Sequence, residues 1–277
     1  MGLRISTNVQ SIAAQRHLAE NSKAQKDTLE HLSSGSRINK ASDDAAGLAI
    51  SEKMKGQIRS IRQGVRNAND GVSMIQTAEG GMNEIGNILT RFRELSIQAA
   101  SDTIGDVERG FIDKEVQQLK QEVTRISASI EFNGKKLLTG EGESLDIQVG
   151  INNNPDVDRF VFDTSKTNVS LSGLSLDNFS VSDKESARSA LEGIDEATKM
   201  LSGNRAELGA LQNRLQSAVN SLTIYDENLS GANSRIRDMD MAQESSELAK
   251  NNILTAAGVS VLSQANSNNM MALKLLS

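Results

Sequence analysis

Residues 187–236 decide the fold, and they read ARSALEGIDEATKMLSGNRAELGALQNRLQSAVNSLTIYDENLSGANSRI. An apolar residue recurs at every seventh position of this stretch and forms the main column. Three positions after each of these residues lies a second column of mostly small or apolar residues, interrupted by Asn204. Two columns with this spacing predict one long helix with a coiled-coil seam, from about Asp183 to Asp238 and roughly 80 Å long. The main column recurs every seven residues and is the expected bundle seam: Ala187, Ile194, Leu201, Leu208, Leu215, Leu222, Leu229 and Ile236.

Two further stretches have the periodicity of helices that could cover this seam. Apolar residues recur in alternating steps of four and three from Met54 to Leu95, and again from Ile112 to Ile130 after the turn SDTIGD at residues 101–106. Helices with one apolar stripe are stable when their stripes face one another. The sequence therefore predicts a mostly α fold, built as a bundle of long helices.

The period changes to two between residues 140 and 182. Leu145, Ile147 and Val149 alternate with polar residues, and Phe160 and Phe162 do the same after a turn that contains Pro155. This alternation is typical of strands rather than helices. We therefore expect a small β-hairpin insertion in the bundle.

The two ends of the chain differ from its middle. Residues 251–277 contain a single charged side chain, Lys274, among apolar residues and asparagines, and residues 1–33 carry a weaker apolar stripe. A nearly uncharged amphipathic tail cannot bury itself alone. It is expected to pack on the N-terminal helix or to be covered by other chains.

Composition argues against several classes of protein. The net charge of −6, without a basic run, does not favour a nucleic-acid partner. The absence of cysteine excludes disulfides and cysteine-ligated metals. No apolar run approaches the ~18 residues that a membrane span needs. After Arg4 the sequence is too polar for the apolar core of a signal peptide, so no cleaved signal is expected.

Residues 32–51, LSSGSRINKASDDAAGLAIS, place two adjacent carboxylates after a serine. Neighbouring residues of a helix point about 100° apart, so Asp43 and Asp44 are not a promising catalytic pair. The expected role of Ser42, Asp43 and Asp44 is to cap a helix, after Gly35 has ended the preceding one. His17 and His31 would lie roughly 21 Å apart along one helix, too far to share a metal. We expect no catalytic residue, metal or cofactor.

This joint resembles the corresponding region of bacterial flagellins, and the resemblance extends along the chain. It includes ISTNVQSIAAQRHL near the N-terminus, then RNANDGVSMIQTAEGGMNEI, LTRFRELSIQAA and EFNGKKLL. Near the C-terminus it includes GANSRIRDMDMAQESSELAKNNILTAAGVSVLSQANSNNMMALKLLS. The similar segments cover about residues 1–140 and 183–277, and they are long and collinear.

The resemblance implies a structural subunit that self-assembles into the extracellular filament of the bacterial flagellum for swimming motility. Residues 1–40 and 240–277 would then form a helical core-tube domain, disordered before assembly. Residues 41–139 and 183–239 would form the bundle, with residues 140–182 as a short variable insertion. The implied partners are other flagellin subunits, the flagellar export apparatus with a secretion chaperone, and the cap and hook-junction proteins.

The apolar residues of the two ends are the expected core-tube assembly surface, with the N-terminal set packed against the C-terminal set. Burying each Leu or Ile side chain contributes about 1.5–3 kcal/mol, and each subunit would repeat the contact with several neighbours. The expected assembly residues are Ile5, Val9, Ile12, Leu29, Leu32, Ile253, Val261, Leu262, Leu273 and Leu276.

The resemblance also indicates a surface for recognition by the vertebrate Toll-like receptor for flagellin. In flagellins that this receptor senses, an Arg and a Leu of one bundle helix and a Glu of the next form the contact; by motif these are Arg91, Leu95 and Glu115. Arg91 and Leu95 are four residues apart and are expected on one helical face. The same face could instead be a contact between subunits.

Two other functions compete with the filament subunit. A hook–filament junction protein of the same superfamily shares both terminal regions, although unbroken motifs such as RNANDGVSMIQTAEG favour the filament protein. A cytoplasmic coiled-coil scaffold would explain the heptads but not the uncharged C-terminal tail.

Overall fold

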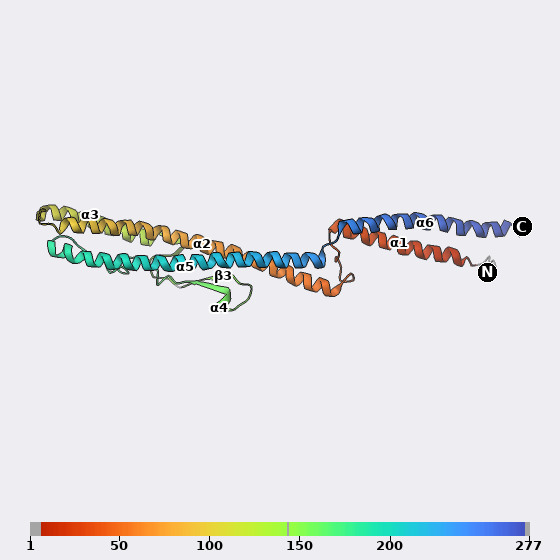
Figure 1. Cartoon of the computed structure of the whole chain (residues 1–277), viewed down its shortest axis with the longest axis horizontal. Coiled ribbons are helices and arrows are strands. Elements are labelled where there is room, and N and C mark those ends of the chain that lie inside the picture. Colours follow the sequence, from red (N-terminus) through yellow and green to blue (C-terminus); the bar gives the residue numbers. More distant parts are fainter. Residues whose placement is uncertain (1–6, 143, 275–277) are drawn as a thin grey trace. The chain divides into compact units, whose positions relative to one another are not determined.

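The computed structural model describes residues 7–142 and 144–274, with side chains as far as residue 268. The chain divides into two compact units, one formed by Met1–Gly56 with Asn228–Ser277 and the other by Gln57–Glu227. Long helices make up most of both units, which confirms the predicted mostly α fold (Figure 1).

Three long helices supply the core of the unit Gln57–Glu227. They are α3 (Asp106–Ser129) and the parts of α2 (Ala45–Ala99) and α5 (Lys184–Arg237) that lie within this unit. The predicted seam of α5 is buried at Ile194, Leu201, Leu208 and Leu215, and Leu222 packs half-buried against the same core. Leu229 and Ile236, the last two residues of the column, belong to the other unit and are half-buried there. The predicted column of α5 is therefore buried or half-buried along its whole length.

A buried arginine connects α2 to α3. Arg109, in the first turn of α3, is 7% exposed. Its guanidinium donates hydrogen bonds to the carbonyl oxygens of Ala99 and Ser101, at 2.9 Å each, and to the carboxylate of Asp106 at 2.7 Å. The last carbonyl oxygens of a helix have no hydrogen-bond donor within that helix. Arg109 supplies a donor to the carbonyl at the end of α2 and also holds the turn between α2 and α3.

Two small antiparallel hairpins follow α3: the first lies just before the insertion, and the second is the hairpin predicted within residues 140–182. In the first, β1 (Glu131–Phe132) pairs with β2 (Lys135–Lys136) around Asn133 and Gly134, which both have positive φ. In the second, β3 (Leu145–Gln148) pairs with β4 (Arg159–Phe162), and the short helix α4 (Pro155–Asp158) lies in the connection.

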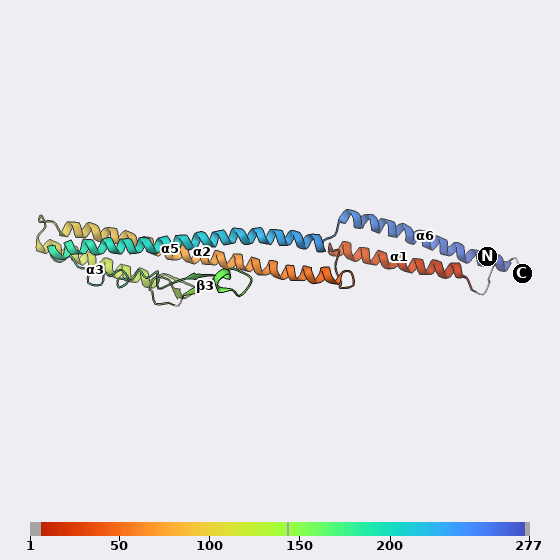
Figure 2. The ribbon, with the colours of Figure 1, turned by 60° about the horizontal axis from the view of Figure 1, so that its bottom comes forward.

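The insertion lies along the bundle and completes its core (Figure 2). Glycines of α2 make this close approach possible: a Cβ at Gly64 would lie 2.1 Å from the carbonyl oxygen of Val149. Apolar side chains of the insertion then enter the bundle core, among them Val149, Phe162, Val169, Leu174 and Phe179.

The predicted break between two helices, at residues 32–51, is present in the other unit. The residue that caps the second helix differs from the first one expected. Gly35 ends α1 in the left-handed conformation with φ 70°, as expected. Asp44, and not Ser42, caps α2, because its Oδ1 accepts a hydrogen bond from the backbone N–H of Gly47 at 2.9 Å. Asp43 instead holds the loop, and its Oδ2 accepts from the N–H groups of Asn39 and Lys40. These two bonds hold the pKa of the Asp43 carboxyl below its ordinary value.

A second break in the same unit separates α5 from α6 (Met241–Lys274), close to the point where the heptads end. Short backbone contacts tie this break to the joint. The N–H of Arg37 donates to the carbonyl of Arg237 at 2.7 Å, and Ser36 and Asp238 form an antiparallel bridge. The boundaries between the two compact units fall inside α2 and α5, and residues 140–182 belong to the unit Gln57–Glu227.

Candidate assembly interface

Helices α1 (Val9–Ser34) and α6 run antiparallel and in contact along their length (Figure 1). Asn8 begins the pair. Its Oδ1 caps α1 by accepting from the N–H of Ser11 at 3.0 Å, and its Nδ2 donates to the carbonyl of Ala265 on α6, also at 3.0 Å. Asn8 thus caps α1 and also holds the N-terminal end of α1 beside Ala265 of α6.

The contact between α1 and α6 is largely polar. As far as residue 268, the side chains buried in it are those of Ser11, Thr28, Asn251 and Ala265, each at most 7% exposed. Ser11 Oγ donates to Asn266 Oδ1 at 2.9 Å, and Asn251 Nδ2 donates to Thr28 Oγ1 at 3.4 Å. Sequence reasoning missed these residues, because serine, threonine and asparagine are mostly found at protein surfaces.

Between these polar contacts the two helices approach closely. Gly258 of α6 has no side chain, and a Cβ there would lie 3.4 Å from Leu18 Cδ1 of α1. Near the joint, His31 Nδ1 lies 3.2 Å from Glu244 Oε1, with each side chain 23% exposed. His31 is therefore a contact residue of the pair, whereas His17 is exposed beside Glu20.

Most of the predicted assembly residues that the structure describes are exposed within this pair, and their role in assembly stays a prediction. Leu32 and Leu262 are half-buried. Ile5 and Leu276, and the side chain of Leu273, lie outside the described residues. The other predicted residues are 48–69% exposed: Val9, Ile12, Leu29, Ile253 and Val261.

The physical reason is that each of the two helices has a polar stripe as well as an apolar one. Where the polar stripes meet, the buried polar side chains are satisfied by hydrogen bonds across the pair and within α1. The large apolar side chains remain outside, and Leu254 and Val259 of α6 are exposed with them. Exposed apolar side chains gathered in this way are typical of surfaces that bind other chains.

The second candidate surface is in the bundle unit. Arg91 Nη2 lies 2.8 Å from Glu115 Oε1, so the structure brings these two predicted residues together, with side chains 48% and 45% exposed. Arg91 also pairs with Glu94 at 2.8 Å. Leu95 is 2% exposed and lies in the bundle core, which corrects its expected place on the surface. Four residues turn a helix by about 400°, and here the extra 40° carries Leu95 from the edge of the face into the core.

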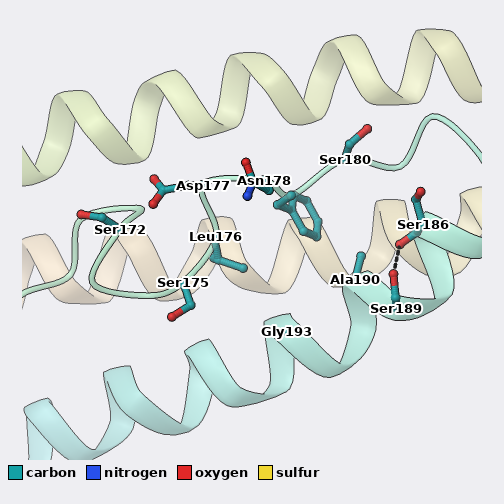
Figure 3. A pocket seen from close by; sticks show the side chains of 11 residues that line it. Ser172, Ser175, Leu176, Asp177, Asn178, Ser180, Ser186, Ser189, Ala190 and Gly193 are labelled. Carbon is teal, nitrogen blue, oxygen red and sulfur yellow. Dashed lines mark hydrogen bonds between the residues drawn. The ribbon is translucent and has the colours of Figure 1, made fainter.

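A groove of about 530 Å³ lies where the end of the insertion meets the start of α5 (Figure 3). Hydroxyls of Ser172, Ser175, Ser180 and Ser189 line it around the side chain of Leu176. Ser189 Oγ donates to the carbonyl of Ser186 at 3.0 Å. Among the described residues that line the groove, Asp177 alone carries a titratable side chain, so the groove assembles no acid–base pair.

No group of three or more His, Asp or Glu side chains in residues 7–142 and 144–268 could hold a metal ion. No helix within the described ranges is long and apolar enough to cross a membrane.

Comparison with known proteins places both terminal regions in one family. Residues 5–143 match the bacterial flagellin N-terminal helical region, and residues 191–276 match the bacterial flagellin C-terminal helical region. The flagellin of Halalkalibacterium halodurans is 42% identical over 272 residues, which are 98% of this chain and 99% of that protein. The flagellar filament 30.7 kDa core protein of Treponema maltophilum is 41% identical over 99% of both chains.

Solved structures agree with this assignment. The crystal structure of Bacillus cereus flagellin is 28% identical, with a TM-score of 0.51, and covers 57% of this chain and 88% of that chain. A structure named as a flagellar hook-associated protein of Vibrio parahaemolyticus gives a TM-score of 0.58 over 71% of this chain and 100% of that one. At 11% identity this second likeness shows a shared fold alone. From the two matched regions and the identity along nearly its whole length, the chain belongs to the bacterial flagellin family.

Proposed function

We propose that this flagellin is the structural subunit of a flagellar filament and that it polymerises through the exposed apolar face of the α1–α6 pair. The observation that carries the proposal is the exposure of Val9, Ile12, Ile253 and Val261 on two paired helices. The family assignment and the relatives named as filament core proteins support the same function.

The mechanism is association without a covalent step. Burying one of these side chains against a neighbour contributes about 1.5–3 kcal/mol. A contact between different surfaces of identical subunits repeats from one subunit to the next and gives an open helical polymer. A few exposed apolar side chains are then sufficient for a long filament, and catalysis has no part in this function.

Polymerisation of the purified full-length chain tests the proposal. Ile253→Ser combined with Val261→Ser should raise the concentration needed for polymerisation by more than about tenfold, because each tenfold step corresponds to 1.4 kcal/mol. Val157→Ser with Val161→Ser is the matched control, since these side chains are also more than half exposed but lie in the insertion. Sedimentation and electron microscopy measure the polymerisation of both double variants. Equal polymerisation of the two would exclude the α1–α6 face as the assembly surface.

The filament role also implies a route out of the cell and a set of partners. The chain would pass through the flagellar export apparatus without a cleaved signal, with a secretion chaperone on its C-terminal segment, and would meet cap and hook-junction proteins at the filament ends. Mass spectrometry of extracellular filaments should find the N-terminus at or next to Met1. An N-terminus beyond residue 15 would contradict this route.

The competing functions have less support. The sequence is 42% identical to a flagellin over nearly its full length but 11% identical to the hook-associated structure. If the chain were a cytoplasmic scaffold, no partner chain would cover the exposed apolar residues of α6.

A second proposed role concerns the face around Arg91 and Glu115, as a contact for the vertebrate Toll-like receptor or for a neighbouring subunit. Both side chains are nearly half exposed and already paired, so a partner would have to take over the hydrogen bonds of Arg91. Leu95 is not part of this proposal. Arg91→Ala should weaken receptor activation by the monomer, polymerisation, or both, and an unchanged result in both assays would end the proposal.

A further inference from the structure

The α1–α6 contact has an unusual composition for a pair of long helices. Coiled coils bury apolar residues at their seams, and a single buried polar residue is known to fix register at a cost in stability. Among the residues of α1 and α6 whose side chains the structure describes, three of the four buried ones are polar, namely Ser11, Thr28 and Asn251. A polar seam of this kind needs an explanation beyond the strength of the pair.

The polar contacts fall at separate levels along the pair and agree on one alignment. Ser11 meets Asn266 at one level, and Thr28 meets Asn251 at another. Leu18 meets Gly258 between them. These pairs advance along α1 as they retreat along α6, as expected for antiparallel helices in a single register.

Other alignments would break these bonds. A shift of α6 by one turn, about four residues, would put Asn251 opposite Ala24 or Leu32, which have no polar side-chain atoms. A buried amide without a partner is costly, because it has lost its hydrogen bonds to water. The apolar stripes, by contrast, remain exposed and would discriminate poorly between shifted alignments.

We propose that Thr28 and Asn251, together with Ser11 and Asn266, are positioning residues that fix the register of α1 against α6. The register decides whether the exposed apolar residues of the two helices line up as one face for neighbouring subunits. The inference rests on the proposed filament function, since it specifies how that assembly surface is aligned.

The absence of cysteine from the natural sequence allows a direct test by cross-linking. Gly258→Cys is combined with Leu18→Cys to report the observed register. It is combined with Ala14→Cys or Ser22→Cys to report a slip of one turn in either direction. Each pair is oxidised in the full-length chain, as monomer and as polymer, with the intact polar seam and with Thr28→Val plus Asn251→Leu.

With the polar seam intact, the pair at 18 and 258 should give most of the cross-linked product. With Thr28→Val and Asn251→Leu, the helices should still pair, but the yield of the slipped pairs relative to the observed register should rise about tenfold, which corresponds to about 1.4 kcal/mol between registers. The matched control is Gln25→Ala with Asn252→Ala, which removes an exposed hydrogen bond between the same helices and should leave the register unchanged.

Three results would overturn the proposal: the observed register persisting in the apolar variant, equal slipping in the control, or the loss of all cross-links in the apolar variant. Failure of the proposed filament function would look different. In that case the chain with the natural sequence would not polymerise, whichever cross-links it formed.

Discussion

At the start of α2, two adjacent aspartates have separate tasks. Asp44 caps the helix through the N–H of Gly47, and Asp43 holds the preceding loop through two other N–H groups. The sequence indicated that this segment caps a helix, because serine and aspartate are common at N-caps. It could not show which of the three residues was the cap, since that depends on the backbone angles of the loop.

Exchange of these residues should separate their roles. Asp44→Ala should lower the free energy of unfolding by about 1 kcal/mol, the usual effect of losing an N-cap. Ser42→Ala is the control and should change it by less than about 0.5 kcal/mol, as for exposed residues in general. Thermal unfolding measures both, and a larger effect for Ser42→Ala would contradict the assignment of the cap.

The aspartate at the start of α5 is expected to make stability depend on pH. Asp183 accepts hydrogen bonds from the N–H and the hydroxyl of Ser186, at 2.9 and 2.7 Å. These bonds hold the pKa of the Asp183 carboxyl below its ordinary value. A carboxyl whose pKa is lowered by folding contributes stability above its unfolded pKa of about 3.9, and this stability is lost as the pH falls through the folded pKa.

We therefore expect the unfolding temperature to fall as the pH is lowered below about 4. Asp183→Asn keeps the shape of the cap but cannot titrate. The difference in unfolding temperature between this variant and the parent chain should be largest near pH 7 and should shrink below pH 4. A difference that stays constant from pH 7 to pH 3 would contradict the role of the carboxylate.

At the scale of the elements, the α5 seam should account for much of the bundle's stability. Leu208 is 3% exposed in the core, and Leu208→Ala should cost about 2–5 kcal/mol through lost burial and the cavity left behind. Ile224, on the same helix, is 59% exposed, and Ile224→Ala should change stability by less than about 0.5 kcal/mol. Urea unfolding compares the two, and similar shifts would contradict the seam.

The long helices could be predicted because a heptad repeat is visible without knowledge of what covers it. The β3–β4 hairpin was predictable for the same reason, from its period of two. The pairing of α1 with α6 was harder, since both helices carry an apolar and a polar stripe and the sequence does not show which stripes meet. Leu95 illustrates the same difficulty in the bundle, where a small rotation separates the surface from the core.

At the scale of the whole molecule, the bundle core and the proposed assembly surface consist of different residues. The unit Gln57–Glu227 holds the main buried cluster of the bundle, whereas the exposed apolar residues of α1 and α6 belong to the other compact unit. Long collinear motifs were enough to predict the family and the filament function. The residues of the proposed assembly surface could not be predicted from the sequence. Burial within the chain decides which apolar residues remain exposed to other subunits, and only the structure shows that burial.

Deletion of residues 253–277 tests this separation most directly. The deletion removes Ile253, Val261 and much of α6 but none of the bundle core in Gln57–Glu227. Circular dichroism should show a bundle that keeps its helices and its cooperative unfolding, while sedimentation and electron microscopy should find no polymer under conditions in which the full-length chain forms filaments. Filaments formed by the shortened chain, or a bundle that no longer unfolds cooperatively, would contradict the account.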